Sequence, residues 1–221
     1  PINSHLQTIS KFAFSRASIK TISIPKTVSF IDECAFTSCE ELQNIEIPLN
    51  LDIQTIERHA FSFTNIKSFY IPPNVSIIRE ASFTNCKKLR NIEIPKNSKL
   101  KIIEDFAFAH SAIEKVSIPS SVSKICYNAF YFCLNLSKVD FSPNSNLQII
   151  KENAFTNIPI NSIIIPSSVT IIEKSAFERC LELKIVEISK ESKLFSIDPM
   201  VFDFCRNIFI MIPARLKDLA K

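Results

Sequence analysis

Nine phenylalanines recur along this chain at two alternating intervals, and this period constrains the fold more than any other feature. The intervals are 22 and 25 residues, so the full period is 47 residues, and the phenylalanines are Phe14, Phe36, Phe61, Phe83, Phe108, Phe130, Phe155, Phe177 and Phe202. A fixed period of about 20 to 50 residues indicates stacked supersecondary units, each of which buries its apolar face against its neighbours. The chain is therefore predicted to form a solenoid, whose function depends on surfaces rather than on a deep pocket.

Each unit contains two short motifs in register with the phenylalanine. The first, L/I-x-x-I-x-I-P, runs from Ile19 to Pro25 in its first copy, and its apolar–polar alternation predicts a short strand with one buried face. Proline ends the strand because it cannot donate to a ladder, although two units have Ser142 or Ser189 in its place. The second motif, I-x-x-x-A-F, occurs at 31–36 and predicts a tight bend with one helical turn, so that successive rings stack into a spine.

The 47-residue pair is the unit of duplication, because alternate units have connectors of different length. Pro48 to Ile56 spans eight positions, whereas Pro25 to Ile31 spans six. We divide the single predicted solenoid, 1–221, into a partial repeat (1–18), four double repeats (19–206), and a C-terminal remainder with a capping segment (207–221). Within that segment, residues 214–219 have leucines three apart and predict a short helix.

Composition excludes several functional classes. The chain has no glycine, and dinucleotide fingerprints, phosphate loops and nucleophile elbows all require it. No apolar run approaches the ~18 residues of a membrane span, and the net charge of +4 is spread too evenly to predict a nucleic-acid interface. Because the chain begins with Pro1 in mid-repeat, we interpret it as a fragment of a longer protein.

The cysteines and histidines predict structural rather than catalytic roles. Four cysteines repeat every 47 residues, and they are Cys39, Cys86, Cys133 and Cys180. Two coils separate them by ~10 Å, too far for a disulfide, so we expect buried thiols. Cys180 and Cys205 lie only one coil apart, and whether they are bridged stays open. The isolated histidines, His5, His59 and His110, predict no metal site and no cofactor, and no Ser-His-Asp set stands out, so we do not expect an enzyme.

Outward-facing strand positions are the candidate partner-binding residues. The middle residue of each I-x-I points away from the core, and these residues are Ser23, Glu46, Tyr70, Glu93, Ser117, Asp140, Ile164 and Glu187. Basic residues flank them at Lys20, Lys67, Arg90 and Lys184. Every long unit supplies an acid, which either forms a stripe that keeps the sheet soluble or offers mixed-charge contacts to a protein. Tyr70 and Ile164 are the expected anchors, because exposed apolar side chains contribute more to binding than scattered charges.

The two motifs together, L-x-x-I-x-I-P followed by I-x-x-x-A-F-x-x-C, resemble the BspA-like leucine-rich repeats from about Leu6 to Pro213. The resemblance implies a curved right-handed solenoid with a parallel sheet on its concave face. It also implies a cell-surface or secreted protein of oral bacteria or mucosal protists, linked to adhesion, antigenicity, virulence and aggregation with other microbes. Family repeats often place glycine before the A-F step, so the turn geometry of this glycine-free chain stays open.

The sequence is compatible with two functions. The first is an extracellular adhesion module that binds a protein through the concave face, either a host matrix or cell-surface protein or another microbial surface protein. The second is an intracellular, cytoplasmic scaffold for protein–protein interaction, which the free thiols favour. Sequons at Asn74 and Asn135 are compatible with export, although a chain this rich in Asn and Ser contains such tripeptides by chance.

Overall fold

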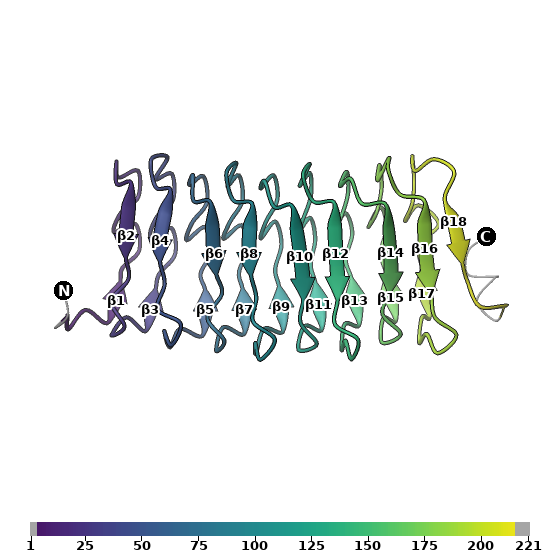
Figure 1. Cartoon of the computed structure of the whole chain (residues 1–221), viewed down its shortest axis with the longest axis horizontal. Helices are drawn as coiled ribbons and strands as arrows, with labels where there is room; N and C mark the ends of the chain where they lie inside the picture. The colour runs from purple at the N-terminus through teal and green to yellow at the C-terminus, as the bar shows by residue number, and fades with distance from the viewer. Residues whose placement is uncertain (1–3, 215–221) are drawn as a thin grey trace.

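A stack of similar coils forms the whole molecule. The computed structural model describes residues 4–214, and Figure 1 shows their coils stacked along one axis, with one coil following the other from end to end. The nine phenylalanines form the predicted spine, with neighbouring ring centroids 5.1 to 5.7 Å apart. The seven inner rings, from Phe36 to Phe177, are completely buried. The spine is the centre of one continuous apolar core.

Each coil contributes strands to two parallel sheets. The longer strands follow the first motif: β2 (Thr21–Ser23), β4 (Asn44–Glu46), β6 (Ser68–Tyr70), β8 (Asn91–Glu93), β10 (Lys115–Ile118), β12 (Lys138–Phe141), β14 (Ser162–Ile165), β16 (Ile185–Ile188) and β18 (Phe209–Met211). Two-residue strands open the second motif: β1 (Thr8–Ile9), β3 (Phe30–Ile31), β5 (Thr55–Ile56), β7 (Ile77–Ile78), β9 (Ile102–Ile103), β11 (Lys124–Ile125), β13 (Ile149–Ile150), β15 (Ile171–Ile172) and β17 (Ser196–Ile197). The predicted parallel solenoid is confirmed.

The single helical turn predicted around each phenylalanine does not form; a third hydrogen-bonded ladder takes its place. Phe106, Phe108 and His110 each donate a backbone hydrogen bond of 2.8 to 2.9 Å to the next coil, whereas Ala109 between them donates to Phe106 within its own coil (3.0 Å). The alternation requires left-handed backbone at both flanking residues, and φ is 55° at Phe106 and 59° at His110. The N–H groups that point to the next coil and those that point into their own coil are thereby all hydrogen-bonded without a helix.

The same left-handed pair recurs in nearly every coil, two residues before and two residues after the spine phenylalanine. Non-glycine residues adopt it at a cost of roughly 1–2 kcal/mol each. In this chain the inter-coil hydrogen bonds offset that cost, although no glycine stands at any of these positions. The capping helix predicted at 214–219 lies, after its first residue, outside the described residues.

The sheet of longer strands is interrupted at two places. Strands pair as β2–β4, β6–β8–β10–β12 and β14–β16–β18, whereas β4 does not pair with β6, nor β12 with β14. The β8–β10 pair is held at a single register position, Asn91 with Lys115. In Figure 1 the strands on either side of the two interruptions stand visibly further apart. The sheet of two-residue strands, by contrast, runs unbroken from β5 to β17.

The segment that leads from the spine phenylalanine to the longer strand differs in length between alternate coils, and we call this segment the arc of the coil. The central strand residue follows the spine phenylalanine by nine positions in long coils, as from Phe130 to Val139, and by eight in short coils, as from Phe155 to Ile163. In the long coils the added residue belongs to a turn closed by a hydrogen bond such as that from Leu136 N to Cys133 O (2.9 Å). Successive strands therefore reach the sheet by two alternating routes. Both interruptions follow a long coil, although β16, which also belongs to a long coil, pairs with β18.

Candidate protein-binding surface

The outward side chains of the nine longer strands form one surface, which we call the strand face. All eight predicted middle residues lie on it, six of them exposed and two, Tyr70 and Glu187, partly buried. Register pairs each short-coil residue with the acid of the following long coil: Ser23 with Glu46, Tyr70 with Glu93, Ser117 with Asp140, and Ile164 with Glu187. The structure therefore brings the predicted set together, although it does not test their role.

The predicted basic flank is exposed but does not neutralise these acids. Lys20, Lys67, Arg90 and Lys184 are all exposed. Within residues 4–214 none of the four forms an ion pair with the strand-face acids; Arg90 instead pairs with Glu114, 3.7 Å from Nε to Oε1. Asp140 is paired by a residue that the pattern did not single out, Lys138, at 2.8 Å. Such exposed pairs contribute little stability, so these charges stay available to a partner.

Four exposed apolar side chains lie on the last three strands, and we call them the apolar strand patch. They are Ile164 (62% exposed), Ile185 (46%), Phe209 (66%) and Met211 (49%). Ile185 is in register with Phe209, while Glu187 lies between Ile164 and Met211 in a second row. Sequence reasoning found only Ile164, because it considered the middle residue of I-x-I alone. Apolar residues at the other outward positions of β16 and β18 were the available signal.

A groove of about 750 Å³ opens where β12 and β14 fail to pair. Phe141 and Ile164 contribute apolar walls, and Ser142 and Ser189 contribute hydroxyls at its end. These two serines are the ones that replace the strand-ending proline, and Ser189 Oγ is buried without a hydrogen-bond partner. Because no strand pairs their facing edges, β12 and β14 also keep backbone N–H and C=O groups free for a ligand.

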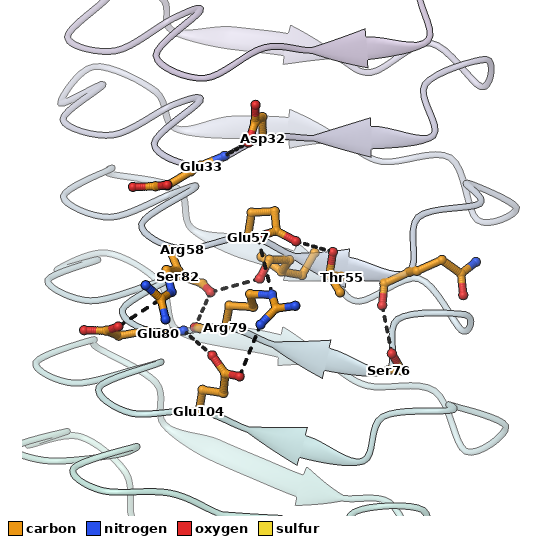
Figure 2. Close-up of polar contacts among 12 residues, drawn as sticks. Asp32, Glu33, Thr55, Glu57, Arg58, Ser76, Arg79, Glu80, Ser82 and Glu104 are labelled. Carbon is orange, nitrogen blue, oxygen red and sulfur yellow. Dashed lines mark hydrogen bonds and ion pairs between the residues drawn. The ribbon is translucent and has the colours of Figure 1, made fainter.

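A second polar cluster lies beside the two-residue strands and ties coils to one another (Figure 2). Arg79 bridges two coils, with Nε 3.4 Å from Glu57 Oε2 and Nη1 3.5 Å from Glu104 Oε1. The other oxygen of Glu104 accepts a hydrogen bond from the backbone N–H of Glu80 (3.1 Å), and Arg58 pairs with Glu80 at 3.7 Å. These partners are 22 to 25 residues apart, so the cluster is structural. It was not predicted from the sequence.

The repeating cysteines are buried thiols, as predicted, with one added feature. The thiols of Cys39, Cys86, Cys133 and Cys180 each donate to the carbonyl oxygen of the spine phenylalanine in the preceding coil, at 2.8 to 3.3 Å. Burial raises the pKa of Cys86 and of Cys133 to about 11, so these thiols stay protonated and unreactive. All seven cysteines are free in the structure, including Cys180 and Cys205.

Within residues 4–214, no three His, Cys, Asp or Glu side chains gather as they would around a metal ion. That part of the chain also contains no helix with the length and apolar character that crossing a bilayer requires.

Comparison with known proteins supports the repeat assignment. The family model described as the BspA type leucine rich repeat region matches in six copies, over residues 7–137 and 101–221. A leucine-rich repeat protein from Bacteroides ovatus has the same fold, with a TM-score of 0.54 at 24% identity over 96% of this chain and 72% of that one.

Two more distant structures are also similar. A leucine rich cell surface protein from Faecalibacterium prausnitzii matches with a TM-score of 0.48 at 18% identity, over 98% of this chain and 86% of that one. The pneumococcal vaccine antigen PcpA matches with a TM-score of 0.42 at 15% identity, over 97% and 81%. None of the curated proteins matches. The repeat motifs, the parallel coils and the family model agree, and the chain belongs to the BspA-type leucine-rich repeat family.

Proposed function

We propose that this chain is a non-enzymatic protein-binding module of a cell-surface or secreted adhesin, and that its strand face is the contact surface. The observation that carries the proposal is that the groove adjoins the apolar strand patch, with which it shares Ile164, at one end of that face. Exposed apolar clusters rimmed by polar residues are typical of protein-interaction sites. Membership of the BspA-type family supports the surface location, because the repeat resemblance implies adhesion to host or microbial proteins.

The geometry favours an extended segment of a partner protein as the bound element. An extended backbone presents N–H and C=O groups that match the unpaired edges of β12 and β14. Its apolar side chains would pack against Ile164 and Phe141, while the Lys138–Asp140 pair supplies polar contacts at the groove margin. The mixed charge signs of this face do not favour a polyanion, so nucleic acid is not the proposed ligand.

Binding to purified host matrix proteins and to intact host cells tests the proposal. The chain is immobilised and its affinity is compared with that of an Ile164→Ala variant and of a matched control, Phe195→Ala. Phe195 is equally apolar and 79% exposed, but it precedes β17 in the other sheet. Loss of an anchor side chain is expected to weaken binding at least ~10-fold, whereas the control leaves it unchanged. Equal binding by all three proteins would move the site off the strand face.

The location is tested separately by antibody staining of intact source cells, with permeabilised cells as the control. Signal on intact cells supports the adhesin. Signal that requires permeabilisation supports the second candidate, an intracellular leucine-rich-repeat scaffold that uses the same face. The seven free cysteines favour that candidate, because oxidising compartments usually convert neighbouring thiols to disulfides.

A further inference from the structure

Cys180 and Cys205 differ from the other thiols of the repeating column because they occupy adjacent coils. Cys39, Cys86 and Cys133 are each separated from the next column cysteine by an intervening coil. Beside the final pair, the spine rings of the same two coils lie 5.7 Å apart. A disulfide joins residues whose Cα atoms are about 4.4–6.8 Å apart, so a one-coil separation suits a bridge and a two-coil separation does not.

The two thiols have unequal access to solvent. Cys180 is completely buried and donates to Phe155 O (3.3 Å), whereas Cys205 is only partly buried and donates to Phe177 O (3.2 Å). Cys205 also lines a small cleft of about 300 Å³, which Arg179 and Arg206 border. A reagent therefore meets Cys205 first.

The electrostatic surroundings give the pair distinct chemical roles. Interaction with the neighbouring Cys180 side chain lowers the pKa of Cys205, against the opposing effects of burial and of Asp203 and Glu178. The same interaction, together with burial, raises the pKa of Cys180. The outer sulfur is thus the readier nucleophile, and the inner one keeps its proton until a reaction removes it.

An exposed guanidinium group also favours one class of reagent. Arg206 is exposed at the cleft and forms no ion pair within residues 4–214, whereas Arg179 lies over the ring of Phe204, 4.8 Å from its centroid, and pairs with Glu178 at 3.3 Å. A small molecule with carboxylates is attracted to such a site.

We propose that Cys180 and Cys205 are a thiol–disulfide exchange site for low-molecular-weight anionic disulfides. The Cys205 thiolate attacks one sulfur of the reagent, forms a mixed disulfide and releases the first thiolate. Cys180 then loses its proton and attacks the Cys205 sulfur, which releases the second thiolate. The protein dithiol has given two electrons to the reagent, whose two thiolates take up the protons released.

The bridge would act on the binding surface. Cys205 precedes β18 by four residues, and β18 presents Phe209 and Met211 of the apolar strand patch. A link to the preceding coil holds this last described strand against β16. The inference stands independently of the proposed adhesin function, because its chemistry needs no protein partner.

The test is incubation of the folded chain with oxidised glutathione, followed by intact-mass measurement and non-reducing peptide mapping. We expect the loss of two hydrogens and a Cys180–Cys205 cross-linked peptide, while the thiols of Cys39, Cys86 and Cys133 stay free. Reduction by dithiothreitol should restore the starting mass. A chain that keeps all seven thiols, or that bridges another pair first, overturns the proposal.

Single variants separate the two roles. Cys180→Ser should stop at a mixed disulfide with one glutathione on Cys205, whereas Cys205→Ser should react far more slowly, and far-UV circular dichroism confirms that both are folded. Arg206→Gln should slow the reaction with oxidised glutathione several-fold and leave the rate with uncharged bis(2-hydroxyethyl) disulfide unchanged. Equal slowing with both reagents would show that the cleft does not select for charge, and the anionic specificity would fall.

Discussion

The phenylalanine spine allows a quantitative test, because it contains the same residue in interior and terminal surroundings. Phe108 is completely buried and stacks on two rings, those of Phe83 and Phe130, each 5.2 Å away between centroids. Phe14 is only partly buried and stacks on one ring, that of Phe36, at 5.1 Å. Truncation of each to alanine removes the same atoms from two different environments.

The expected losses follow from burial and stacking. Phe→Ala in a closed core costs about 3–5 kcal/mol of the free energy of unfolding, which includes the cavity left behind. Each stacked ring pair adds about 0.5–1.5 kcal/mol beyond burial. Phe108→Ala should therefore cost about 4–8 kcal/mol, because it loses two ring contacts and leaves a closed cavity. Phe14→Ala should cost about 2–3 kcal/mol, because solvent already reaches that site and it loses one ring contact.

Urea denaturation followed by far-UV circular dichroism measures both losses, and tyrosine emission provides a second probe, since the chain has three tyrosines and no tryptophan. Hydrogen exchange reports whether the coils around Phe108 open separately from the rest. If the two variants lose the same free energy within ~0.5 kcal/mol, the spine does not couple neighbouring coils and the reasoning fails.

Three further substitutions test other parts of the structure. Ser38 has a left-handed backbone, with φ at 58°. Ser38→Gly should raise the free energy of unfolding by about 0.5–1 kcal/mol, whereas Ser38→Ala should leave it unchanged. Thermal melting measures both variants, and equal melting temperatures would exclude backbone strain at this position. Arg79→Met should cost about 1–2 kcal/mol, and Arg90→Met, which breaks one exposed pair, less than ~0.5; a loss for Arg79→Met that 1 M salt does not reduce would argue against ion pairing. The pKa of Cys133 is raised in the folded protein to about 11 from an ordinary value of 9.0. The protonated thiol therefore contributes fully to the free energy of unfolding below pH 9, and this contribution is lost as the pH rises to 11. Cys133→Ala should therefore remove up to ~3 kcal/mol of that alkaline destabilisation, and parallel pH curves for parent and variant would contradict the burial effect.

Much of the fold was predictable because a solenoid repeats its environments. Positions that meet the same neighbours in every coil select the same residue types, so a single sequence contains nine samples of each environment. The phenylalanine spine, the position of the longer strands and the buried cysteines could be read in this way. The outward residues of I-x-I were also placed on one face, because strand alternation is a local property.

Backbone hydrogen bonding around the spine was not predictable from the same pattern. The motif at 103–108 suited a helical turn by its apolar spacing, but its N–H groups bond alternately along the axis and within the coil. Nothing in the side chain of Phe106 signals a left-handed backbone, and the sequence offers no glycine to mark the positions. The carbonyls of the neighbouring coil, 21 to 24 residues away, decide the conformation.

The sequence by itself determined the period, the strand positions and which side chains enter the core, because each depends on a pattern repeated along the chain. Only the tertiary structure decided which coils pair. The lapse between β12 and β14, the groove that opens there, and the meeting of Ile185 with Phe209 depend on how arcs of eight and nine residues bring distant strands to one surface. The alignment of one coil with the next depends on the whole path of the backbone around the coil, and the spacing of residues within a motif does not determine it.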